Sequence, residues 1–435
     1  MIDRFMNFTR ALVILAVTSS PTLAELRIEI SEGVEKAVPI AVVPFGWDGQ
    51  GAAPYDVSAV VTADLARSGR FKPMPPRDMI ERPTSGREID FEDWRLLGIE
   101  VIIIGRLIEA GPGEYTIQFQ LFDVFRGEQL LGYRQPAKQT QMRAASHLVA
   151  DMIYKELTGV EGIFSTRIAY VTADGKPPQQ VYRLVVADAD GENARVLVES
   201  EEPLMSPAWS PDGRKLAYVS FEQKRASIYV QTLRSGARQR VSSRAGVNGA
   251  PAWSPDGRSL ALTLSKSDGN LDIYTLGLAD QVLKRLTERP SIDTEPTWSA
   301  DGKAIYFTSD RAGRPQVYRI AAAGGRPERV SFEGPYNARP RLTPDGEGLA
   351  VVHNDRGNYR IAMVDLDRGY TQVLTRGSLD ESPSFAPNGE TLIYATRQGG
   401  RGVLATVTTD GLVHQRISSV AGDVREPAWS PFRPY

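Results

Sequence analysis

The stretch Pro207-Ala208-Trp209-Ser210-Pro211-Asp212-Gly213 recurs through the C-terminal part of the chain. Its copies begin at Pro251, Pro296, Pro340, Pro383 and, in partial form, Pro427. The leading prolines are 43 to 45 residues apart. Self-similarity at about 40–50 residues is typical of β-propellers and other repeat folds. We therefore expect a repeat architecture over residues 165–435.

Each repeat predicts four short strands in one sheet. The first strand carries Trp, Leu or Phe at its centre and leads into a tight turn, because proline presets φ and glycine accepts a positive φ. In the first complete repeat, the other strands are expected at 216–220, 228–230 and 240–242. A sheet that is apolar on both faces needs neighbours, so the repeats should stack radially as blades. The repeated Trp, Pro and Gly residues are interpreted as core and turn residues.

The two ends of the repeat region complement each other. Residues 168–172 align with a second strand, and no first strand precedes them. The last copy, Pro427-Ala428-Trp429-Ser430, has no second strand after it. We infer that the C-terminal strand completes the first blade, which gives an all-β six-bladed β-propeller and removes an open sheet edge.

Composition excludes several classes of partner and site. The chain has 435 residues, of which 41% are hydrophobic and 24% charged, and its formal net charge is −2. This balance gives no electrostatic attraction for nucleic acid or for an anionic membrane surface. Cysteine is absent, so disulfides and thiolate metal sites cannot form.

Residues 1–24 have the pattern of a secretory signal peptide. Arg4 and Arg10 precede the apolar run 11–17, and small residues place the cleavage site after Ala24. The apolar run is too short to span a bilayer, which takes about 20 residues. We expect an exported mature protein that does not insert into a membrane.

Residues 25–160 lack the repeat and predict an α/β domain. Strands are expected at 38–45, 101–108 and 115–125, and helices at 56–67, 90–97 and 143–157, from their apolar periodicity. The first residues, 25–31, alternate charged and apolar side chains. This stretch is either an edge strand of the N-terminal domain or a mobile arm that adds as a strand to a partner's sheet.

A search for catalytic motifs predicts no enzyme. Nucleophile elbows, zinc-protease helices and phosphate loops are missing, and the three histidines, His147, His353 and His414, are too scattered along the chain to predict one metal site. Acidic residues such as Glu295 and Glu426 are interpreted as solvated loop residues in preference to a glycosidase pair. A third possibility is a tunnel that binds a small ligand, a glycan or a cation. No cofactor and no resident metal are expected.

These features together resemble the TolB family, the exported periplasmic component of the Tol-Pal envelope system of Gram-negative bacteria. The resemblance covers the whole mature chain. It rests on the signal peptide, the small α/β domain, the junction at 158–171, the repeats and the stretch 310–318. The repeat alone is less specific, because it also occurs in propellers attached to peptidases.

The resemblance implies a non-enzymatic adaptor, which we expect to be a monomer. Its propeller would bind Pal, the peptidoglycan-associated lipoprotein, over one face of the ring, and engagement of Pal would be coupled to release of an arm that binds TolA. Such an adaptor maintains outer-membrane integrity and supports constriction at cell division. The alternative is an exported propeller enzyme or binding protein acting on envelope glycans or peptides.

By the same resemblance, the segments just before each Pro-x-Trp strand should form the Pal face, and Val247 departs from a polar residue that the family often has there. The residues expected in that face are Asn248, Gly249, Ala250, Asp293, Thr294, Glu295, Asn337, Arg339, Asp380, Glu381, Arg425 and Glu426. The residues expected in the TolA-binding arm are Glu25, Leu26, Arg27, Ile28, Glu29 and Ile30.

Overall fold

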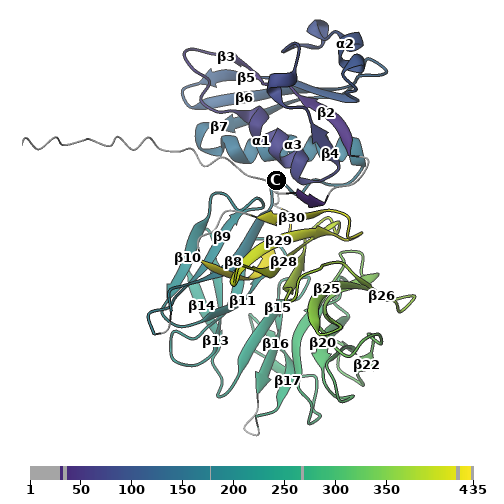
Figure 1. Ribbon diagram of the computed structural model, residues 1–435. Helices are drawn as coiled ribbons and strands as arrows, with labels where there is room; N and C mark the ends of the chain where they lie inside the picture. The colour runs from purple at the N-terminus through teal and green to yellow at the C-terminus, as the bar shows by residue number, and fades with distance from the viewer. Residues whose placement is uncertain (1–29, 33–36, 177, 266–268, 418–421, 433–435) are drawn as a thin grey trace, which may run out of the picture.

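The computed structural model describes residues 30–32, 37–176, 178–265, 269–417 and 422–432. They form an α/β domain followed by a β-propeller (Figure 1). The predicted signal peptide and most of the predicted arm lie outside the described residues.

The N-terminal domain is one mixed sheet with helices packed on it. The sheet order is β4-β2-β5-β6-β7, and β3 pairs with β5. β2 is parallel to β4 and β5, whereas β5, β6 and β7 are antiparallel to one another. The strands are β2 (Val38–Val42), β3 (Gly46–Asp48), β4 (Phe71–Pro73), β5 (Val101–Gly111), β6 (Glu114–Asp123) and β7 (Glu128–Lys138). The helices are α1 (Val57–Arg67), α2 (Phe91–Leu96), α3 (Met142–Thr158) and the short 3-10 helices η1 (Pro76–Asp78), η2 (Gly86–Glu88) and η3 (Gln139–Gln141).

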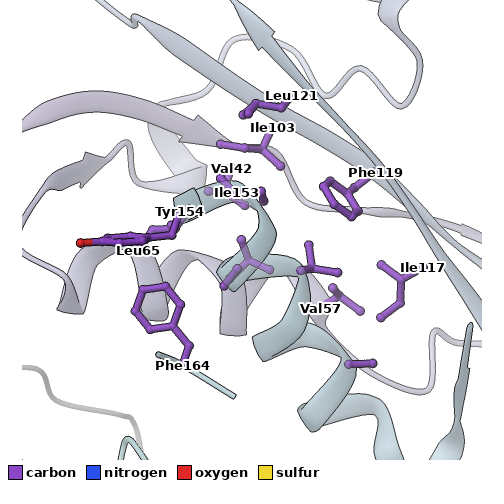
Figure 2. Packing of buried hydrophobic residues seen from close by; sticks show 14 of the residues in the cluster. Val42, Val57, Leu65, Ile103, Ile117, Phe119, Leu121, Ile153, Tyr154 and Phe164 are labelled. Atoms are coloured by element: carbon purple, nitrogen blue, oxygen red, sulfur yellow. The ribbon is translucent and has the colours of Figure 1, made fainter. Parts of the chain in front are cut away.

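Local capping fixes the ends of the two long helices. Asp56 is the N-cap of α1 and its carboxylate accepts from the Ala59 N–H at 3.0 Å. α3 ends at Gly159, whose φ of 77° suits glycine. Both helices turn their apolar stripes toward the sheet, where Leu65 and Ile153 pack with strand residues such as Ile117 (Figure 2). The predicted helices and strands of this domain are confirmed, and β3, β4 and β7 are additions that the sequence did not reveal.

The propeller consists of six antiparallel sheets among the described residues, as predicted. The first three blades contain β31 (Asp423–Trp429), β8 (Arg167–Asp174), β9 (Val181–Asp188) and β10 (Arg195–Ser200); β11 (Leu204–Trp209), β12 (Lys215–Ser220), β13 (Ser227–Thr232) and β14 (Arg238–Ser242); and β15 (Asn248–Trp253), β16 (Ser259–Ser265), β17 (Leu271–Gly277) and β18 (Leu283–Arg285). The other three contain β19 (Asp293–Trp298), β20 (Ala304–Ser309), β21 (Gln316–Ala321) and β22 (Glu328–Arg329); β23 (Asn337–Leu342), β24 (Gly348–Asp355), β25 (Asn358–Asp365) and β26 (Thr371–Val373); and β27 (Glu381–Phe385), β28 (Thr391–Gln398), β29 (Arg401–Thr408) and β30 (His414–Ile417).

The ring closes as the incomplete repeats at the two ends of the propeller sequence predict. β31, the last strand, pairs antiparallel with β8, so that Trp429 lies opposite Ile168. The Arg167 N–H also donates to Ser430 Oγ at 3.0 Å across a sequence separation of 263 residues. The first blade is therefore assembled from both ends of the propeller sequence.

The repeated residues join neighbouring blades and shape the turns. The indole N–H of Trp253 donates to the Ala208 carbonyl at 3.0 Å, and the indole N–H of Trp298 donates to Ala252 at 3.2 Å. Each of these two tryptophans thus bonds to the backbone of the blade before it. In the turn, Asp256 accepts from Ser254 Oγ at 2.6 Å. These hydrogen bonds show that the repeated residues have a structural role in the scaffold, as the sequence analysis predicts.

The N-terminal domain lies against the last and first blades (Figure 1). The Tyr154 hydroxyl donates to Glu390 at 2.8 Å, and Asn388 Nδ2 donates to the Glu161 carbonyl at 3.1 Å. β1 (Ile30–Glu32) pairs antiparallel with β30 at the outer edge of the last blade. Of the stretch 25–31, Ile30 and Ser31 are therefore not in an edge strand of the N-terminal domain, because the free sheet edge that they join belongs to the propeller.

Candidate functional site

The inner strands of the blades line a central tunnel. Each inner strand carries a β-bulge immediately before its proline, where the pairing register shifts. The residue at each bulge has a φ between 45° and 57°, which is uncommon outside glycine. We call these tunnel-lining residues the first ring: Ser206, Ala250, Glu295, Arg339, Ser382 and Glu426.

Arg339 links the charged members of the first ring. Its Nε lies 2.6 Å from Glu295 Oε1, and its Nη2 lies 3.7 Å from Glu426 Oε1. Its backbone N–H also donates to Glu295 Oε2 at 3.0 Å. Burial alone would lower the pKa of Arg339, but the two carboxylates outweigh burial and raise its pKa. The guanidinium of Arg339 therefore forms ion pairs with both glutamates of the first ring. Neither carboxylate is free, as the two carboxylates of a glycosidase pair would be.

Four of the residues expected in the Pal face are no more than 1% exposed: Asn248, Asp293, Asn337 and Asp380. Asn248 Oδ1 accepts from Ser242 Oγ at 2.6 Å, and Asp293 forms an ion pair with Arg311 at 2.7 Å. Each instead anchors the loop that enters its blade. All four side chains satisfy backbone and side-chain groups within the protein, so the interpretation of acidic loop residues as solvated is wrong for Asp293 and Asp380.

The other expected residues lie nearer the surface. Gly249, Ala250, Thr294, Glu295, Arg339, Glu381 and Glu426 are partly exposed, and Arg425 is exposed. They stand at the start of the inner strands. β27 starts at Glu381 and runs toward Asn388 and Glu390, which contact the N-terminal domain. The expected residues thus lie at the end of the ring that faces away from that domain.

Sequence reasoning missed a set of apolar side chains at the same end of the ring. They lie in the strands and loops that lead to the first ring, and they are exposed to solvent although they are apolar. The four residues are Met205, Val247, Ile292 and Phe332. Val247 directly precedes Asn248, and Ile292 directly precedes Asp293. For Val247 and Ile292, the signal available in the sequence was an apolar residue next to a buried polar anchor. We call these four residues the apolar rim.

A second group of charged residues joins the two domains. His147 Nδ1 lies 2.6 Å from Asp64 Oδ2, and its Nε2 lies 3.9 Å from Asp190 Oδ2. Arg67 lies 2.7 Å from Asp64, and Arg143 forms an ion pair with Asp190. Burial alone would lower the pKa of His147, but Asp64 and Asp190 together outweigh burial and raise its pKa. We call these five residues the interdomain cluster.

Asp64, His147 and Asp190 are the one group among the described residues that has the spacing of a metal site. Two guanidinium groups already occupy the carboxylates, and a metal ion there would face both positive charges. The cluster therefore has the chemistry of an ion-pair network. His353 lies elsewhere, with Nδ1 2.9 Å from Asn337 Oδ1, so it does not join this cluster.

Within the described part of the chain, no helix is long and apolar enough to cross a bilayer.

Comparison with known proteins gives matches along nearly the whole chain. Residues 154–433 match the family model described as the TolB beta propeller domain, and residues 26–130 match the TolB amino-terminal domain. The Tol-Pal system protein TolB of Xanthomonas campestris pv. campestris (strain B100) is 53% identical over 94% of this chain and 93% of its own length. The protein of the same name from Xanthomonas oryzae pv. oryzae (strain PXO99A) is 51% identical over the same shares. The crystal structure of TolB from Acinetobacter baumannii superposes with a TM-score of 0.86 at 42% identity, covering 93% of this chain and 99% of that chain.

Proposed function

The chain belongs to the TolB family of Tol-Pal system proteins, and from this membership we propose that it is a non-enzymatic periplasmic adaptor. Its propeller binds the lipoprotein Pal, and its N-terminal arm binds TolA. Through these two contacts it maintains outer-membrane integrity and supports constriction at division. The observation that carries the Pal assignment is the apolar rim, four exposed apolar side chains in the segments that lead to the first ring.

The apolar rim supports protein binding for a physical reason. Exposed apolar side chains that cluster within a polar surround mark interaction sites, because a partner removes them from water. Polar residues at the same end of the ring, Thr294 and Glu381 among them, are partly exposed and can supply the hydrogen-bonding border. The N-terminal domain leaves this end of the ring uncovered, since its contacts with Asn388 and Glu390 lie at the other end.

The position of β1 supports the arm assignment. β1 has three residues, and its register shifts between Ile30 and Glu32, so it adds few backbone hydrogen bonds to β30. A strand held this weakly on a sheet edge can exchange to the edge of another protein's sheet. The residues before it, 25–29, are the rest of the proposed arm.

The Pal assignment is tested by titrating residues 25–435 with the soluble domain of Pal from the same organism in a calorimeter. Val247→Asp places a carboxylate in the apolar rim and should weaken binding at least tenfold, about 1.4 kcal/mol. Val282→Asp is the matched control, because Val282 is 60% exposed and Val247 is 43% exposed. Val282 lies in the β17–β18 turn, away from the rim. Equal affinities of the two variants would refute the proposed face.

The arm assignment is tested by deleting residues 25–31. The deletion should abolish binding to the soluble domain of TolA and leave the melting temperature within about 2 °C, because only β1 is lost from the described fold. Unchanged TolA binding would refute the assignment. Pal binding by the same variant shows that the propeller remains intact.

A further inference from the structure

The tunnel has a second ring of side chains, two residues beyond the first. Side chains two apart on a strand share a face, so the residue after each proline also lines the tunnel. The second ring is Ala208, Ala252, Thr297, Arg341, Ser384 and Ala428. Five members are small and uncharged. Arg341 is the single charged member.

Arg341 differs from Arg339 in its partners. Its Nη1 donates to the Pro340 carbonyl at 2.9 Å. Among the described residues, no carboxylate lies within ion-pair distance of Arg341, whereas Arg339 reaches both Glu295 and Glu426. Burial and the charge of Arg339 lower the pKa of Arg341 by more than the more distant Glu295 and Glu426 raise it. The guanidinium is therefore a cation that faces a cavity without a close ion-pair partner, an arrangement that costs free energy unless an anion is present.

Two hydroxyl groups on the second ring could add to this charge. Ser384 Oγ accepts from the Trp429 N–H at 2.9 Å, which leaves its own proton able to donate into the tunnel. Thr297 also lines the tunnel. A guanidinium and hydroxyl donors are the groups that proteins use for carboxylate and phosphate oxygens, and arginine binds both in a two-pronged geometry.

We propose that the second ring is a binding site for a small anion bearing carboxylate or phosphate oxygens, with Arg341 as its principal contact and Thr297 and Ser384 as hydroxyl donors. A cation would be disfavoured here, because Arg341 repels it and Arg339 already engages the glutamates of the first ring. The site does not depend on the proposed binding of Pal or TolA.

The experiment measures the melting temperature of residues 25–435 as inorganic phosphate or succinate replaces chloride at constant ionic strength and pH. The wild-type protein should show a saturable rise with at least one of the two anions, and the responding anion identifies the chemistry of the ligand. Arg341→Met should lose at least half of that rise, and Arg341→Lys should retain more of it. Arg214→Met is the matched control, since Arg214 is an exposed arginine on a repeat turn, and it should respond as wild type does.

A second measurement separates ligand binding from a structural role. In chloride alone, Arg341→Met should melt at or above the wild-type temperature, because it removes a charge that has no close ion-pair partner among the described residues. The proposal is overturned if neither anion raises the melting temperature of the wild-type protein. It is also overturned if the melting temperature of Arg341→Met rises as much as that of the wild type. An Arg341→Met protein that unfolds in chloride also overturns it, since the side chain would then be structural.

Discussion

The substitution Asp64→Asn at the interdomain cluster should lower the free energy of unfolding by about 3–5 kcal/mol. Asp64 is 1% exposed in its side chain and faces both Arg67, at 2.7 Å, and His147, at 2.6 Å. Removing one partner of a buried ion pair costs about that amount, because the remaining charges stay buried without compensation. Urea titrations followed by circular dichroism and tryptophan fluorescence measure the loss.

The same cluster sets a pH dependence with a definite sign. The folded pKa of His147 lies above its ordinary value of about 6.5, so the protonated form is favoured in the folded state. This contribution to stability is fully present below about pH 6.5 and is lost as pH rises through the folded pKa. The free energy of unfolding of the wild-type protein should therefore decrease as the pH is raised through the folded pKa of His147. That of Asp64→Asn should decrease less, because the Asp64 carboxylate, which raises this pKa, is gone.

The matched control is Asp78→Asn. Asp78 pairs with Arg77 at 3.7 Å, and both side chains are exposed, so the loss should be less than about 1 kcal/mol. If Asp64→Asn costs no more than this control, the cluster does not stabilise the domain contact. A wild-type pH profile that Asp64→Asn leaves unchanged would refute the role of His147.

Three further changes test the scaffold. Trp253→Ala should cost about 3–5 kcal/mol by thermal or urea unfolding, because it removes a buried ring and the bond to Ala208, and Pal affinity of the folded fraction should be unchanged. Gly402→Ala should cost about 1–3 kcal/mol, since a Cβ there would lie 2.4 Å from the Val424 carbonyl oxygen, whereas Gly111→Ala meets nothing within 4 Å and should be nearly neutral. Truncation after residue 422 removes β31 and should abolish cooperative unfolding of the propeller in calorimetry; a sharp transition at the wild-type temperature would contradict closure by that strand.

The repeat fold could be predicted because its signal is local and periodic. The spacing of the prolines, the Pro-Asp-Gly turns and the incomplete repeats at both ends lie in the sequence itself, and together they specify six blades and the way they close. The long helices were equally accessible, since Asp56 marks the start of α1 and the apolar stripe marks its inner face. β7 (Glu128–Lys138) was missed because it is an edge strand, largely exposed, whose polar residues do not alternate as a half-buried strand does.

The candidate site was less accessible because it depends on contacts between distant residues. Asn248 and Asp293 were expected in a partner-binding face, yet both side chains are buried, because partners such as Ser242 and Arg311 satisfy their polar groups. The apolar rim interrupts the expected polar character of the loops and carries no motif. The interdomain cluster joins positions 64, 147 and 190, so periodicity within any one segment could not reveal it.

Closure of the ring by its last strand also governs the order in which the protein can fold. β31 is synthesised after every other strand of the ring, and its partner β8 was made first. Until β31 arrives, β8 presents an unpaired edge and the last blade lacks its neighbour. Contacts of such long range close slowly, because the chain entropy must be lost before they form. The propeller should therefore mature in one late step, and during that interval the open edge of β8 is the part that most needs protection from aggregation.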